Sequence, residues 1–132
     1  MEYLVIRIQD DAAAPAHWIA VDGSGARRSP PVTGPLAEAR SDAGDRKVIV
    51  LVPSAEVLTT TVDIPVKGGS KLQAALPYAL EEFLADDVDK LHFAAGARRA
   101  SGRVPVSVVS KAKLKGWLDR LSEAGIRASS IV

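Results

Sequence analysis

Five carboxylates gather in one short stretch of the chain: Glu81, Glu82, Asp86, Asp87 and Asp89. Clustered carboxylates can bind a metal ion, but a calcium site needs a loop, turned by glycine, that places alternating oxygen ligands around the ion. Here the carboxylates straddle the expected end of a helix, and no glycine lies among them. Two interpretations therefore stay open: a solvated helix end, or a docking face for a basic partner.

The other reactive side chains form no catalytic or metal-binding pattern. His17 and His92 each lie in an expected strand without a second histidine or cysteine nearby in the sequence, so neither is expected to bind zinc. No serine lies in a nucleophile-elbow sequence. The sequence therefore predicts no catalytic residue, no metal site and no cofactor, and we expect that the protein is not an enzyme.

Length, charge and composition narrow the class of protein. The 132 residues correspond to one domain or to a piece of a longer protein, and 47% hydrophobic residues suffice for a buried core. The net charge of +1 provides no overall attraction for nucleic acid. The absence of cysteine excludes disulfides and fits a reducing compartment. No apolar run approaches the roughly 20 residues of a membrane-spanning helix, and the start lacks a secretory-signal pattern, so the chain as given is expected to be soluble.

An amphipathic helix is expected at about 71–85. Ser70 can cap its first turn, and Gln73 can complete a capping box. The apolar residues recur at the spacing of one buried stripe: Leu72, Leu76, Ala79, Leu80 and Phe83. The residues expected to face water are Gln73, Tyr78, Glu81 and Glu82. Pro77 removes one helical hydrogen bond, which predicts either a kink or a separate first turn.

Apolar periodicity also predicts a series of strands, at 3–9, 17–22, 47–53, 57–64, 90–95 and 104–110. A second helix is expected at about 111–124, capped by Ser110 and ended by Gly125, with Ile126 folding back onto its last turn. Residues 26–35 are rich in proline, glycine and arginine and are expected to form a loop. A short helix or a single turn is expected at 36–40, and another apolar segment begins at 129.

The arrangement of these elements predicts the fold class. The first two strands are expected to pair as an antiparallel hairpin, and the last two as another hairpin with a basic tip at Arg98, Arg99 and Arg103. We interpret this tip as exposed and flexible, with contact to phosphate or to an acidic protein as the alternative. The order of strands and helices predicts an α/β fold, or α+β, with a mixed β-sheet and helices packed on it. One domain spanning 1–132 is expected.

Several motifs occur together in the order and spacing of one protein family. The sequence LPYALEE at 76–82 is followed by LADDV at 84–88 and LHFA at 91–94. The segment LVPSAEVL at 51–58 precedes a strand that ends in Ile64-Pro65, and VSVVSK at 106–111 precedes the second helix. This series resembles the cytoplasmic domain of general secretion pathway protein L, an inner-membrane component of bacterial type II secretion systems. The similarity is strongest from about residue 48 onward.

The resemblance implies a subdomain of the actin-like ATPase (RNase H-like) fold, in which turns after strands contact phosphate. The turn at 10–15 carries carboxylates but no glycine, and Pro15 offers no amide, so phosphate would meet negative charge with poor backbone access. The turn Asp22-Gly23-Ser24-Gly25 has glycines but lacks the lysine and the following helix of a P-loop. We interpret it as a plain turn and expect nucleotide binding to be disfavoured.

The resemblance also implies a function and partners. The domain would recruit the N-terminal domain of the type II secretion ATPase to the inner membrane by docking, without catalysis. It would be the first cytoplasmic region of a longer, membrane-anchored protein, and other inner-membrane platform proteins would bind the remaining parts of that protein. The carboxylates expected to bind the partner are Glu81, Glu82, Asp86 and Asp87. The alternatives are an actin-like nucleotide-binding domain and the equivalent adaptor of a type IV pilus assembly system. A homodimer through a sheet edge or the helix of Trp117 is compatible with docking.

Overall fold

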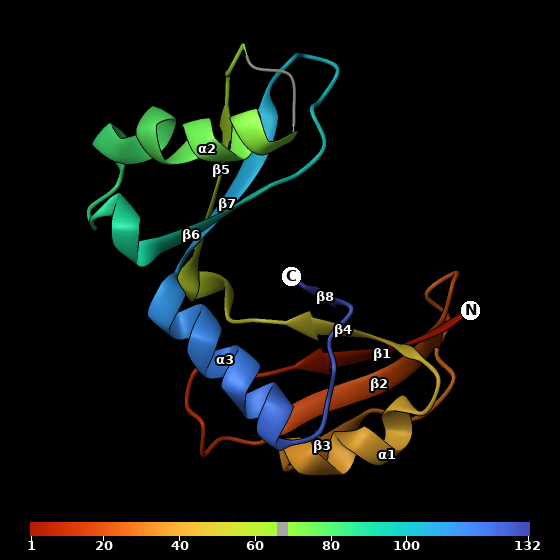
Figure 1. Ribbon diagram of the computed structural model, residues 1–132. Helices are drawn as coiled ribbons and strands as arrows, with labels where there is room; N and C mark the ends of the chain where they lie inside the picture. Colours follow the sequence, from red (N-terminus) through yellow and green to blue (C-terminus); the bar gives the residue numbers. More distant parts are fainter. Residues whose placement is uncertain (66–68) are drawn as a thin grey trace. The chain divides into compact units, whose positions relative to one another are not determined.

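The computed structural model describes residues 1–65 and 69–132, which form two compact units (Figure 1). Unit 1 comprises Met1–Pro53 and Gly116–Val132, and unit 2 comprises Ser54–Lys115. Each unit has its own β-sheet and its own buried apolar side chains. The α/β class expected from the sequence is confirmed, with the strands divided between two sheets.

Unit 1 is built on a five-stranded mixed sheet in the order β3-β2-β1-β4-β8. Its strands are β1 (Glu2–Arg7), β2 (Ala16–Asp22), β3 (Val32–Gly34), β4 (Lys47–Leu51) and β8 (Ser130–Ile131). The antiparallel pairing of β1 with β2 confirms the first predicted hairpin, and β4 lies between the parallel strands β1 and β8. The loop predicted at 26–35 is wrong in part. β3 is too short to show a pattern of its own and forms by pairing with β2.

Short helices and one longer helix accompany the strands of unit 1. η1 (Leu36–Glu38) and α1 (Ala39–Ala43) lie where a short helix was expected, and α1 is tied to β2 because the indole Nε1 of Trp18 donates to Asp42 Oδ2 at 2.7 Å. α3 (Lys111–Glu123), which belongs to unit 1 from Gly116 onward, confirms the second predicted helix. Gly125 has a φ of 72°, and the Ile126 amide donates to the Leu121 carbonyl at 2.9 Å, so the predicted left-handed ending is confirmed.

Unit 2 contains a three-stranded antiparallel sheet in the order β5-β7-β6. Its strands are β5 (Val57–Val62), β6 (Leu91–Ala95) and β7 (Val104–Ser110), and the predicted β6–β7 hairpin is confirmed. η2 (Ser54–Glu56) precedes β5. α2 (Gly69–Leu80) packs its buried leucines into one apolar cluster with Phe93, Val106 and Val108 of the sheet (Figure 1). No helix in the described residues has the length and apolar character needed to cross a membrane.

The end of α2 differs from the prediction. Leu72, Leu76 and Leu80 are buried as expected, but α2 stops at Leu80 and the chain tightens into the 3₁₀ turn η3 (Glu81–Phe83). The change of helical period carries Phe83 off the apolar stripe, so its side chain is 72% exposed instead of buried. Ala79, also expected in the stripe, is exposed.

The start of α2 also corrects two expectations. Ser70 lies inside the helix rather than before it, and the Gln73 amide donates to the Phe93 carbonyl at 2.6 Å, so the predicted capping box is not formed. Gln73 is an exposed residue, as expected, and this bond ties its side-chain amide to β6. The helix continues across Pro77, so the first turn is not a separate element.

Replacing Leu76, whose side chain has 0% exposure, with Ala is expected to lower the free energy of unfolding of unit 2 by about 2–5 kcal/mol, because a cavity opens in its core. Phe83→Ala is the control, with an expected change within about 0.5 kcal/mol because the ring is exposed. Urea unfolding followed by circular dichroism measures both values. A large loss for Phe83→Ala would place that ring in the core after all.

Candidate docking surface

The acidic segment lies between α2 and β6, on η3, on η4 (Val88–Lys90) and on the residues that join them. All four carboxylates expected to bind a partner, Glu81, Glu82, Asp86 and Asp87, belong to exposed residues. Residues 81–90 hold five carboxylates against Lys90, a net charge of −4 in a chain whose total is +1. Charged groups that stay solvated at a surface steer a partner of opposite charge and orient it on arrival.

Two exposed aromatic side chains accompany these carboxylates. Tyr78 on α2 is 76% exposed and Phe83 on η3 is 72% exposed. Aromatic residues are enriched at the centres of protein interfaces, because they bury a large area at a small cost in side-chain entropy. The sequence interpretation placed Phe83 in the core and therefore missed it. The Glu81-Glu82 pair is the signal that indicates its exposure, since two carboxylates at a helix C-terminus oppose the helix dipole and favour an earlier end.

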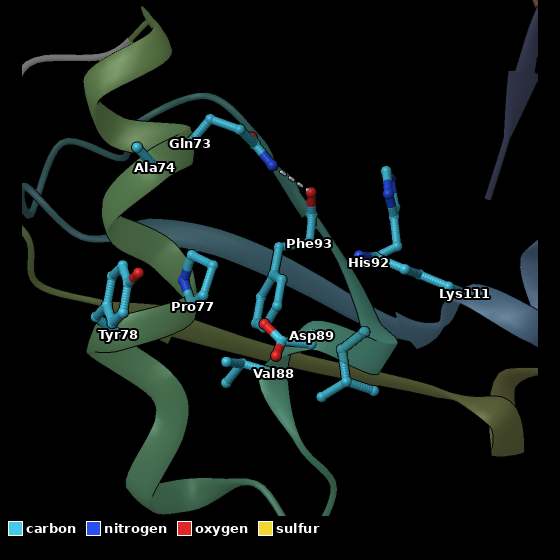
Figure 2. Close-up of a pocket in the computed structure, with 10 residues that line it drawn as sticks. Gln73, Ala74, Pro77, Tyr78, Val88, Asp89, His92, Phe93 and Lys111 are labelled. Atoms are coloured by element: carbon cyan, nitrogen blue, oxygen red, sulfur yellow. Dashed lines mark hydrogen bonds between the residues drawn. The ribbon is translucent and has the colours of Figure 1, made fainter.

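A groove opens beside this segment, between α2 and β6 (Figure 2). Its volume is about 340 Å³, and its apolar lining comes from three elements: Pro77 of α2, Val88 of η4 and Phe93 of β6. Asp89 lines it as well and carries the acidic character of the segment to the groove. At this volume the groove lies near the lower end of the range for ligand pockets and has room for one or two side chains.

His92 is exposed, as the alternation of β6 predicted. Figure 2 shows His92 and Lys111 on the side of β6 away from α2. Both residues also line the groove, so its rim carries basic side chains there and an acidic one at Asp89. Among the residues that the structure describes, no three histidine, cysteine, aspartate or glutamate side chains come together as a possible metal site.

The glycine-bearing turn after β2 is closed by its own aspartate. Asp22 Oδ1 accepts hydrogen bonds from the Ser24 hydroxyl at 2.6 Å and from the amides of Ser24 and Ala26 at 2.9 and 3.0 Å, while Gly25 adopts a φ of 86°. The Ser24 hydroxyl, then the two amides, and to a smaller extent the charge of Arg28, hold the pKa of Asp22 below its ordinary value. These amides point at a carboxylate within the turn, which disfavours their use for phosphate.

The other candidate phosphate turn, at 10–15, is closed in the same way. Asp11 Oδ1 accepts from the Ala13 amide at 2.9 Å, and the Asp11 carbonyl accepts from the Ala14 amide at 3.1 Å. Two of the amides that a phosphate would need therefore already donate within the turn. Neither turn gathers free amides into an anion-binding nest.

Comparison with known protein sequences gives a consistent result. The family described as "Type II secretion system (T2SS), protein L" matches residues 4–132. Type II secretion system protein L of Dickeya chrysanthemi is 30% identical over 134 residues, covering 99% of this chain and 33% of the relative. The Pseudomonas aeruginosa protein of that name is 34% identical over 116 residues, covering 88% of this chain and 28% of the relative. The chain thus spans about a third of the length of the curated relatives it matches.

Solved structures give the same picture for the fold. The cytoplasmic domain of EpsL, an inner membrane component of the type II secretion system of Vibrio cholerae, has a TM-score of 0.79 and 26% identity, covering 99% of this chain and 57% of the other. The PilM–PilN type IV pilus biogenesis complex has a TM-score of 0.67 at 16% identity, covering 99% and 47%. A Bacteroides thetaiotaomicron protein with an actin-like ATPase fold scores 0.50 at 8% identity, covering 98% and 51%. The last two similarities concern the fold alone.

The lowered pKa of Asp22 predicts a pH-dependent contribution to stability. A carboxyl group whose pKa is lower in the folded state stabilises the fold above its unfolded pKa and loses that contribution as the pH falls through the folded pKa. We therefore expect wild type to melt higher than Asp22→Asn at pH 7, with the difference shrinking below about pH 4. Both tryptophans, Trp18 and Trp117, lie in unit 1, so tryptophan fluorescence reports the melting of the unit that holds this turn. A difference that stays constant down to pH 3 would contradict the assignment.

Proposed function

We propose that this chain, which belongs to the type II secretion system protein L family, acts as a docking module of the inner-membrane assembly platform. In this proposal the chain binds the N-terminal domain of the secretion ATPase and holds it at the membrane without catalysing a reaction. The chain is then the N-terminal part of the cytoplasmic region of a longer, membrane-anchored protein.

The observation that carries the proposal is the exposed segment at 78–87. It combines Tyr78 and Phe83 with the four carboxylates, and in the described part of the chain no hydrogen bond or ion pair engages those carboxylate groups. A solvated helix end needs no exposed aromatic rings, whereas a docking surface uses them for contact area and uses the charges for orientation. The turns at 10–15 and 22–25 support the same view, because their amides donate to their own aspartates.

The direct test replaces Glu81, Glu82, Asp86 and Asp87 together with Ala and measures binding to the isolated N-terminal domain of the cognate secretion ATPase by calorimetry. We expect the affinity to fall about tenfold or more, because each lost charge pair contributes a few tenths of a kcal/mol and the effects add over four sites. The salt dependence of binding should also become weaker.

The matched control removes the same charge elsewhere by replacing four other exposed acidic residues with Ala: Glu38, Asp45, Asp63 and Glu123. This variant is expected to bind within about twofold of wild type, since its net charge changes equally but the docking segment is intact. Equal losses in both variants would indicate a general charge effect. An unchanged affinity in the first variant would remove the segment from consideration as the docking site.

A further inference from the structure

The three-stranded sheet of unit 2 ends in two edge strands, β5 and β6. The Gly96 amide donates to the carbonyl of Pro105 in β7 at 2.8 Å. This bond shows which alternate residues of β6 form hydrogen bonds with β7. In an antiparallel pair, alternate residues direct both backbone groups to the partner strand, and the others direct both away from it. Leu91, Phe93 and Ala95 therefore direct their backbone groups away from β7, toward the edge of the sheet.

A side chain already covers one of these groups. Gln73 of α2 donates from Nε2 to the Phe93 carbonyl at 2.6 Å, in the place that an added strand would occupy (Figure 2). The Leu91 amide is also used, by the Val88 carbonyl. The Phe93 amide and both backbone groups of Ala95 remain directed at the edge.

The other edge is protected in a similar way, which makes it a suitable comparison. Arg103 donates from Nη2 to the Thr61 carbonyl at 3.2 Å and from Nε to the Thr61 hydroxyl at 3.0 Å. Thr59 and Thr61 are therefore the residues of β5 whose backbone groups point away from β7, as those of Phe93 and Ala95 do on β6. Covering an exposed edge with a polar side chain is a common defence against unwanted strand pairing.

Each edge borders a hollow, and the two hollows differ in their lining. Thr59, Thr60 and Thr61 of β5 line one of about 560 Å³, whereas β6 opens on the groove beside α2, whose lining includes apolar side chains. An extended segment lying along β6 would place alternate side chains on the α2 side of the sheet, where Pro77, Val88 and Phe93 form the apolar lining of the groove. Main-chain hydrogen bonds then provide affinity, and the groove selects the side chain. A volume of about 340 Å³ suits one aliphatic or aromatic side chain with part of its neighbours.

Charge indicates the nature and direction of the segment. Asp86, Asp87 and Asp89 outnumber Lys90 in the segment just before β6, whereas Arg98 and Arg99 follow the strand. The edge is therefore acidic where β6 begins and basic beyond its end. A complementary segment carries basic residues at the end that lies beside Asp86 and Asp87, with an apolar residue near its middle.

We infer that the β6 edge binds an extended, basic and apolar segment of a partner protein as an additional strand, and that the Gln73 amide gives up the Phe93 carbonyl to it. This inference rests on the proposed docking function, with the ATPase domain as the partner. It adds the manner of binding, in which the acidic segment orients the partner and the strand edge holds it.

The first test is amide hydrogen exchange of the wild-type chain, free and saturated with the N-terminal domain of the cognate secretion ATPase. The exchange rates of the Phe93 and Ala95 amides are expected to fall by about tenfold or more in the complex, while the amides of Thr59 and Thr61 exchange at the same rates as in the free chain. Binding without slower exchange at Phe93 and Ala95 would overturn the strand-addition inference and leave the docking function intact. Absence of binding would overturn both.

The second test uses proline at matched positions on the two edges. Ala95→Pro removes an amide that points away from β7, so the sheet keeps its own hydrogen bonds, and the ring blocks an added strand. Thr59→Pro makes the same change on β5. We expect Ala95→Pro to weaken binding about tenfold or more and Thr59→Pro to leave it within about twofold. Equal effects of the two substitutions would contradict the inference.

The substitution Gln73→Ala tests whether the Gln73 side chain competes with the partner for the Phe93 carbonyl or only stabilises the fold. If the Gln73 amide competes with the partner for the Phe93 carbonyl, removing it should tighten binding about two- to fivefold even though the chain loses a hydrogen bond. A merely structural role predicts weaker binding together with lower stability. Melting of each variant by circular dichroism shows that it is folded before its affinity is compared.

Discussion

The structure of unit 2 depends on the packing of three leucines, Leu72, Leu76 and Leu80, against one face of a three-stranded sheet. A sheet of this size is not stable alone and needs an amphipathic element over its apolar face. The leucines recur every four residues, which fixes the rotation of α2 about its axis and therefore the direction of every other side chain on it. Gln73 is directed to the edge of β6 by that rotation, and Tyr78 is directed to solvent.

The end of the leucine stripe precedes the exposed acidic segment proposed for docking. α2 ends at Leu80, and the Glu81-Glu82 pair disfavours its continuation because two carboxylates at a helix C-terminus oppose the helix dipole. The chain turns through η3 and η4 before entering β6, and the carboxylates and Phe83 lie on the outside of that turn. A surface formed in this way offers charge and aromatic area directly to a partner protein.

Local patterns in the sequence predict most elements but not the tertiary contacts that modify them. The alternation of Leu4 and Ile6, the hairpin of β6 and β7 and the glycine ending of α3 all follow from periodicity or from single-residue conformational preferences. β3 forms only by pairing with β2, and the contact of Gln73 requires β6 to lie beside α2. The family resemblance predicted a docking role and the helix pattern predicted the exposure of Tyr78, while the exposure of Phe83 and the groove appear only in the folded chain.

The most direct measurement is isothermal calorimetry of the wild-type chain against the N-terminal domain of the cognate secretion ATPase, with magnesium ATP as a parallel ligand. A docking module predicts binding of the protein in the micromolar range or tighter, and no heat from the nucleotide. Heat from the nucleotide without binding of the protein would contradict the account. The amides of Ser24 and Ala26, which donate to Asp22, would then have to break these hydrogen bonds to bind phosphate. Absence of both signals would contradict docking by this chain.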